Sequence, residues 1–210
     1  MPEMGKKVDR IERRVSKPSA PQQTTSYLDD LDTQLMLQVR DGNREAANSL
    51  IRRNFSRISR YIARLVGYNR PVEDLTQDVF LQAITRAAHY KPTAKVTTWL
   101  YRIATNTSLN YLKQPSVKLL AAEPPEGALE LPARAESAPE RQVNLDELKA
   151  QVADAIAALP INQRIALTLF QYEDFSYEQI AIVLDVTVEA VRSLLMRART
   201  TLRGKLAGLL

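Results

Sequence analysis

The side chains best suited to a defined chemistry lie near the C-terminus, on one arc of a helix expected over 188–207. At about 100° per residue this arc carries four side chains, with two arginines at its margin: Arg192, Ser193, Met196 and Arg197, then Arg199 and Arg203. Arginine donates paired hydrogen bonds to guanine edges, and serine can bond any base. Such an arc is typical of a helix that lies in the major groove of DNA. The alternative interpretation is a solvated basic surface.

The segment in front of this helix favours the DNA interpretation. Ser176 and Gln179 have the spacing of a capping box, in which each side chain binds the other residue's backbone N–H. Residues 185–187 predict a tight turn, and Thr187 can cap the helix that follows. Apolar residues at spacings of four, three and four mark the buried side of that helix: Val191, Leu195, Ala198 and Leu202. The pattern predicts a helix-turn-helix.

A second group of candidate binding residues lies on a helix expected over 98–114 and stopped by Pro115. One face combines an indole, two amides and two cations: Trp99, Arg102, Asn106, Asn110 and Lys113. The ring suits base stacking, the amides can pair with base edges, and the cations can hold phosphate, as in single-stranded nucleic-acid binding. The alternative is that Trp99 fills the core while the polar residues face water. Spacing alone does not decide between the two.

Three further helices are expected in front of this one. A helix over 31–41 ends at Gly42, and a helix over 71–88 exposes Asp74, Gln77, Asp78 and Gln82. A long helix over 44–66 buries one apolar face and carries arginines on the other: Arg44, Arg52, Arg53, Arg57, Arg60 and Arg64. That arginine face is either solvated or follows phosphates.

Composition bounds the class of protein. The chain has 210 residues, six glycines and no run of alternating β-branched residues, which predicts an all-α fold. It has no cysteine, so disulfides, thiol catalysis and cysteine-based metal sites are excluded, and His89 is its one histidine. We find no carboxylate pair, nucleophile–base set or phosphate loop, and expect neither an enzyme nor a bound metal or cofactor. No apolar run is long enough to cross a membrane, and residues 1–26 do not resemble a signal peptide, so we expect a cytoplasmic protein.

Charge and proline content divide the chain, whose net charge is +5. Residues 1–26 are basic and predict a disordered arm, while 27–114 predict a small helical domain. Residues 115–142 are acidic and hold five of the eleven prolines, which predicts a flexible linker. Residues 143–210 predict a second small helical domain.

Three sequence blocks, in this order, resemble the extracytoplasmic-function (ECF) sigma factors of bacterial RNA polymerase. They are PVEDLTQDVFL at 71–81, TWLYRIATNT at 98–107, and the LP…QR…SYEQIA…VRS…RAR series at 159–199. The NTSLNYL run at 106–112 and ESAPER at 136–141 look most like the sigma-E envelope-stress branch.

The resemblance implies a sigma region 2 bundle at 27–114 and a sigma region 4 helix-turn-helix at 143–210. Region 2 would bind the clamp helices of the polymerase β′ subunit, and region 4 would sit on the β flap. The partners implied are core RNA polymerase, promoter DNA and an anti-sigma factor, either membrane-bound or free. The protein itself would not insert into the membrane, and alone it would be a monomer.

Carried over by position, the resemblance assigns the site residues. Core-polymerase binding falls on Asp74, Gln77 and Asp78, and −35 recognition falls on the arc of 188–207 described above. Recognition and melting of the −10 element fall on the loop at 90–97 and the polar face of 98–114: Tyr90, Lys91, Trp99, Arg102, Asn106, Asn110 and Lys113.

Some positions depart from the family pattern. Pro92 replaces a glycine and stiffens the −10 loop, Ala190 removes a hydroxyl, and Leu194 replaces an arginine. Two other functions therefore stay open. One is a stand-alone helix-turn-helix regulator, and the other is a sigma-like regulatory protein with weakened DNA contacts. The arm at 1–26 is either an inert tail or an additional phosphate-binding segment.

Overall fold

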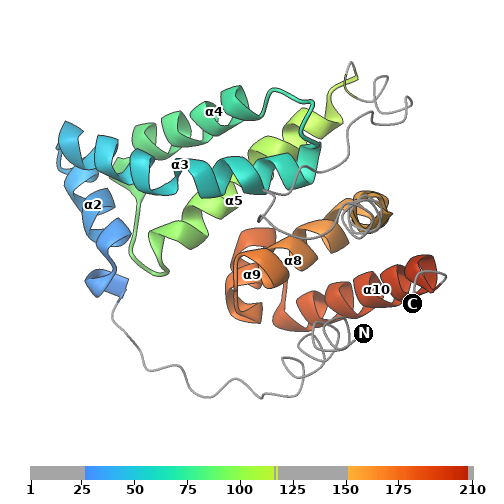
Figure 1. Cartoon of the computed structure of the whole chain (residues 1–210). Helices are drawn as coiled ribbons and strands as arrows, with labels where there is room; N and C mark the ends of the chain where they lie inside the picture. Colours follow the sequence, from blue (N-terminus) through green and yellow to red (C-terminus); the bar gives the residue numbers. More distant parts are fainter. Residues whose placement is uncertain (1–26, 116, 118–150, 208–210) are drawn as a thin grey trace, which may run out of the picture.

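The computed structural model of the chain describes residues 27–115, 117 and 151–207, and its regular elements there are all helices (Figure 1). The basic arm, nearly all of the linker and the start of the second domain lie outside the described residues. The first domain contains η1 (Tyr27–Asp29), α2 (Leu31–Arg40), α3 (Arg44–Val66), α4 (Val72–Thr85), η2 (Ala87–His89) and α5 (Val96–Lys113). The second contains a helical segment at 151–157, α8 (Ile161–Tyr172), α9 (Tyr177–Leu184) and α10 (Val188–Leu206). The all-α, two-domain prediction is confirmed.

Local signals define several helix ends. The Asn43 side chain caps α3 by accepting hydrogen bonds from the N–H groups of Glu45 and Ala46, at 3.0 and 3.1 Å. Gly42, which separates α2 from α3, has a φ of 92°, a conformation that glycine adopts without strain. Two predicted ends were wrong. Helix α4 stops at Thr85, and a 3₁₀ turn replaces its last residues; α5 begins at Val96 instead of 98.

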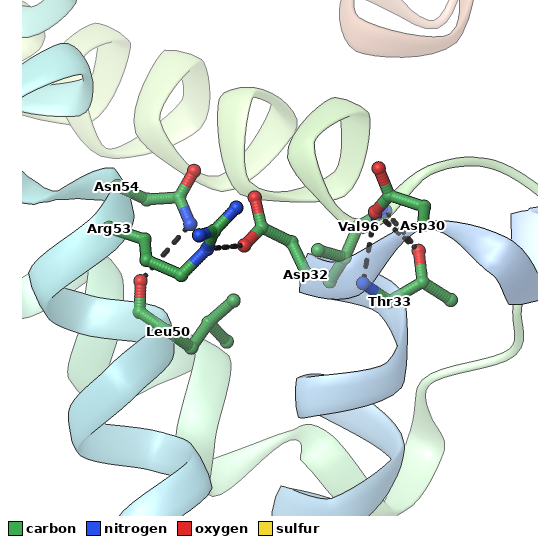
Figure 2. A network of polar contacts seen from close by, with 7 residues as sticks. All are labelled: Asp30, Asp32, Thr33, Leu50, Arg53, Asn54 and Val96. Carbon is green, nitrogen blue, oxygen red and sulfur yellow. Dashed lines mark hydrogen bonds and ion pairs between the residues drawn. The ribbon is translucent and has the colours of Figure 1, made fainter.

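The early start of α5 has a physical cause in α2. The N–H of Val96 donates a hydrogen bond to the hydroxyl of Thr33 at 3.3 Å, so this helix end is satisfied from another helix (Figure 2). The carboxylate of Asp30 caps α2 and also accepts from the Thr33 hydroxyl. In the same network Arg53 of α3 binds Asp32 at 2.7 Å. Helix α2 thereby fixes the positions of both α3 and the start of α5.

The second domain has the predicted helix-turn-helix. Both bonds of the capping box are present: Ser176 Oγ accepts from the N–H of Gln179 at 3.3 Å, and the Ser176 N–H donates to Gln179 at 2.9 Å. Asp185 ends α9 in a left-handed conformation, and Thr187 caps α10. Val191, Leu195 and Ala198 are buried as the periodicity predicted, whereas Leu202 is half-buried.

The two domains are packed together. Helices α8 and α9 lie against α3 and α5, and one hydrophobic cluster runs through both domains (Figure 1). Tyr101 of α5 is central, because its ring contacts Tyr61 on one side and Phe175 of the second domain on the other, with centroids 4.8 and 4.9 Å apart. The amphipathic patterns had predicted which faces are buried but not this contact between domains.

Candidate polymerase and nucleic-acid interfaces

The acidic face of α4 is open to solvent. Asp74, Gln77 and Asp78 are all exposed, as their spacing predicted. Leu81, three residues after Asp78, lies on the same face and its surface is 65% exposed. Sequence reasoning missed Leu81, although its spacing from Asp78 was a usable signal. Gln82 was expected on this face but is half-buried, and its amide donates to the Thr107 hydroxyl of α5 at 3.2 Å.

The start of α5 presents an aromatic pair rather than two separate rings. Trp99 is half-buried, and its ring centroid lies 5.4 Å from that of Tyr90. Tyr90 is buried, its hydroxyl donates to the carbonyl of Ala94 at 3.1 Å, and burial raises its pKa. Tyr90 therefore supports the indole and offers no open ring face to a base. This restricts the role expected for Tyr90 to a supporting one.

The remaining polar residues follow Trp99 along α5. Asn106, Asn110 and Lys113 are exposed, and Lys91 is exposed in the loop before the helix. Arg102 is partly covered, because its guanidinium lies 3.5 Å from the carboxylate of Asp185 in the second domain. The amides and the terminal lysine therefore form an accessible stripe, while Arg102 is engaged across the domain contact.

The loop that contains Pro92 is held by its own backbone. The Thr93 N–H donates to the carbonyl of Lys91 at 2.8 Å, and the hydroxyl of Tyr90 reaches Ala94. Pro92 itself is half-buried. The loop is therefore a compact turn in front of Trp99, as a proline in place of glycine would favour.

The polar arc of α10 is largely accessible. Its exposed members are Arg192, Met196, Arg197 and Arg203. Met196 is 62% exposed, and Ser193 is half-buried. The guanidinium of Arg192 lies 3.8 Å from the carboxylate of Glu189, one turn earlier. Both side chains are exposed, so this ion pair is weak and Arg192 can bind another anion instead.

Two residues near this arc point inward. The guanidinium of Arg199 lies 5.4 Å above the ring of Phe170 in α8, and its Nη2 is buried without a hydrogen-bond partner among the described residues. The sequence placed Arg199 at the margin of the arc, but it is half-buried against α8. Leu194 packs on the hydrophobic core, which explains why an apolar residue is tolerated where the family pattern has arginine.

The described residues contain no group of three or more histidine, aspartate or glutamate side chains placed to hold a metal ion. None of their helices has the length and apolar character that crossing a bilayer requires.

Comparison with known proteins decides the family. Residues 50–116 match the model of sigma-70 region 2, and residues 149–202 match that of sigma-70 region 4. The chain is 32% identical over 184 residues to the ECF RNA polymerase sigma-E factor of Haemophilus influenzae, covering 85% of this chain and 97% of that protein. It is 34% identical over 188 residues to the ECF RNA polymerase sigma-E factor of Escherichia coli K12, covering 85% and 96%. The chain belongs to the ECF sigma factors.

As an ECF sigma factor it is an alternative sigma factor that directs transcription initiation. The fold agrees with solved structures. CnrH, solved in complex with the cytosolic domain of CnrY, matches with a TM-score of 0.63 at 24% identity, covering 85% of this chain and 99% of that one. RpoE of Bartonella quintana, solved with the anti-sigma factor NepR, matches with a TM-score of 0.61 at 20% identity, covering 76% and 96%.

Proposed function

We propose that this ECF sigma factor divides promoter recognition among three surfaces. The face of α4 formed by Asp74, Gln77, Asp78 and Leu81 binds the β′ clamp helices of core polymerase. The stripe of α5 from Trp99 to Lys113 captures the −10 element during melting, and the arc of α10 reads the −35 element. The exposure of all three surfaces on one chain carries this proposal, because each is an open polar face on a helix whose opposite face is buried.

The chemistry of each surface suits its proposed partner. Carboxylates and an exposed leucine on α4 complement a basic helical surface, and no DNA-binding role suits an acidic face. Asn106 and Asn110 carry the donors and acceptors that a displaced base needs, and Trp99 lies about two turns before Asn106 on the same helix. Arg192 and Arg197 project from the groove-facing side of α10. The second domain would also contact the β flap, and the linker at 115–142 would follow the path toward RNA exit.

We infer that an anti-sigma factor, free or membrane-bound, regulates this protein in a stress response. RpoE of Bartonella quintana has been solved with such a partner, and the identities to sigma-E factors support the same type of control here. The proposed role is regulatory and not catalytic, requires no metal or cofactor, and places a monomeric free protein in the cytoplasm.

The deciding experiment combines purified protein with core polymerase on a library of promoters randomised at −35 and −10. The proposal expects transcripts that start at a fixed distance from one enriched sequence pair and that depend on the added protein. A tight footprint on DNA without polymerase, with no initiation in its presence, would instead identify a stand-alone helix-turn-helix regulator. Polymerase binding without promoter selection would identify a sigma-like protein with weakened DNA contacts, for which Ala190 and Leu194 would be the first positions to examine.

A further inference from the structure

Met196 is the apolar member of the otherwise polar arc on α10. The residue is 62% exposed. At about 100° per residue, its side chain lies between Arg192, one turn earlier, and Ser193. Leu195 and Ala198, on the other side of the helix, are buried in the core, which Met196 does not join. Packing therefore does not account for a thioether at this position.

An apolar side chain among polar base-reading groups suits one feature of a base edge. Thymine presents a methyl group in the major groove, which apolar side chains contact, whereas arginine binds guanine. Met196 would therefore read a thymine beside a guanine bound by Arg192. This assignment rests on the proposed function, because it takes the arc of α10 as the reader of the −35 element.

Met196 also carries the accessible sulfur of the described residues. The chain has four methionines and no cysteine. Met36 is fully buried, and Met1 and Met4 lie outside the described residues. An oxidant that meets the folded protein finds no thiol to attack, and within the described part of the chain it can reach only the thioether of Met196.

Oxidation would change the property on which the contact with thymine depends. A two-electron oxidant such as hypochlorous acid adds one oxygen to the sulfur of methionine. In the net reaction an S–O bond forms and the O–Cl bond breaks, so the sulfur is oxidised, the chlorine leaves as chloride and one proton passes to solvent. The product, methionine sulfoxide, is polar, and two reductases, one for each sulfoxide epimer, reverse the change.

The neighbours of Met196 would extend the effect beyond its own side chain. A sulfoxide oxygen accepts hydrogen bonds, and the exposed Arg192 lies one turn away on the same helix. The ion pair of Arg192 with Glu189 spans 3.8 Å between two exposed side chains and is therefore weak. The hydroxyl of Thr200, one turn later, already donates to the carbonyl of Met196 at 3.1 Å. The guanidinium of Arg192 is thus available to bind the sulfoxide in competition with guanine.

We propose that Met196 is a reversible oxidation site that controls −35 recognition. The thioether form reads thymine, the sulfoxide form loses this contact, and reduction by methionine sulfoxide reductases restores it. The fold is retained in both forms, because the side chain is largely exposed and lies outside the hydrophobic core.

The test oxidises the free full-length protein and then measures promoter binding by the reconstituted holoenzyme. Hypochlorous acid is quenched with free methionine before core polymerase is added, so the polymerase itself is never oxidised. Mass spectrometry of peptides locates each added oxygen. We expect Met196 to be oxidised before the buried Met36, and circular dichroism to show unchanged helix content.

The oxidised holoenzyme should bind its preferred −35 sequence about tenfold more weakly, which is comparable to the effect of one mismatched base pair. Its affinity for non-specific DNA should stay the same, because the phosphate contacts are unchanged. Selection from a randomised −35 library should show a lost preference for thymine at one position and a weaker preference for the neighbouring guanine. Treatment with both reductases should restore affinity and preference.

Met196→Leu is the matched control, because it removes the sulfur and keeps an apolar side chain of similar size. It is compared with its own untreated form, and oxidant should leave its affinity unchanged. The other three methionines remain in this variant, so a loss of affinity there would come from another site. Met196→Gln carries a polar side chain of similar length and, without oxidant, should resemble the oxidised parent.

Three results would overturn the oxidation site. They are a Met196 that resists oxidant in the folded protein, an oxidised Met196 with unchanged −35 preference and affinity, and an equal loss of affinity in treated Met196→Leu. If the untreated parent holoenzyme already lacks any −35 preference, the proposed function fails and the proposed control by oxidation falls with it. That failure is seen before oxidant is added, so it is distinguishable from the other three.

Discussion

The hydroxyl oxygen of Thr33 in α2 lies 3.3 Å from the backbone nitrogen of Val96, the first residue of α5. Thr33 is fully buried, so this bond is shielded from water. It fixes where α5 begins and therefore where Trp99, three residues later, is presented. A side chain more than sixty positions away in the sequence thus positions the proposed −10 surface.

Replacing Thr33 by valine should destabilise the protein by about 1–3 kcal/mol, because the N–H of Val96 loses its buried acceptor. Thr33→Ser keeps the hydroxyl, so its free energy of unfolding should fall clearly less than that of Thr33→Val. Urea unfolding followed by circular dichroism gives both free energies of unfolding. Equal stability of Thr33→Val and the parent would show that water or another group replaces the threonine.

Reversing the charge of Asp78 should weaken binding to core polymerase by about tenfold or more, about 1.4 kcal/mol, because the acidic face of α4 is proposed to meet a basic surface. Asp41→Lys is the control, since Asp41 is also exposed but lies at the end of α2. Fluorescence titration with labelled protein measures both affinities. If both variants bind like the parent, the polymerase site lies elsewhere.

Truncating Asn106 to alanine should leave polymerase binding intact and impair strand opening, because its amide is proposed to pair with a displaced base. Permanganate reactivity of thymines in the open complex reports opening directly. Asn48→Ala, a change of the same kind on the exposed side of α3, should behave like the parent. Normal reactivity in Asn106→Ala would remove this residue from the −10 surface.

Arg197 and Arg203 should differ in what they contribute to α10. A bidentate contact from arginine to guanine carries about 1–3 kcal/mol of discrimination, whereas a phosphate contact weakens all sequences alike. Arg197→Ala should therefore relax the preference at one −35 base pair, and Arg203→Ala should lower affinity evenly and flatten its salt dependence. Selection from a randomised −35 library with each holoenzyme tests this. An unchanged −35 preference in Arg197→Ala would contradict base readout by that residue.

Alkaline pH should destabilise the fold through its buried phenols. Burial raises the pKa of Tyr61 well above its ordinary value of 10.0, and its hydroxyl shares a 2.7 Å hydrogen bond with Thr105. Below pH 10 the phenol of Tyr61 is neutral in both the folded and the unfolded protein. Above pH 10 the unfolded chain loses the proton that the folded protein keeps, so stability falls by up to about 1.4 kcal/mol per pH unit for this residue.

Tyr61→Phe should be less stable at pH 7, because it lacks the bond to Thr105, yet its stability should fall less steeply above pH 10. Urea unfolding at pH 9, 10 and 11 gives the two slopes. Parallel slopes would mean that Tyr61 does not keep its proton in the folded state.

Short-range signals made much of the fold predictable. The capping box of Ser176 and Gln179 and the cap at Thr187 each join residues three apart, so the sequence displays both partners together. The exposure of Asp74, Gln77 and Asp78 followed from helical period alone.

Long-range partners were not predictable in this way. Nothing near Glu173 in the sequence indicates that Arg57 and Arg64, more than one hundred residues earlier, enclose its carboxylate. The start of α5 was misplaced by two residues for the same reason, because the N–H of Val96 binds the distant hydroxyl of Thr33. Arg199 was assigned to the DNA arc from its angle, but the attraction of its guanidinium to Phe170 holds it inward.

The contact between Tyr90 and Trp99 also supplies an optical probe. Trp99 is the one tryptophan of the chain among eight tyrosines, so excitation at the red edge of the absorption band selects a single ring. That ring is half-buried at the start of α5, so the wavelength of its fluorescence emission responds to local hydration and to any base that stacks on it. Unmodified protein mixed rapidly with polymerase and promoter would therefore report the arrival of the opened strand in real time, at a known position.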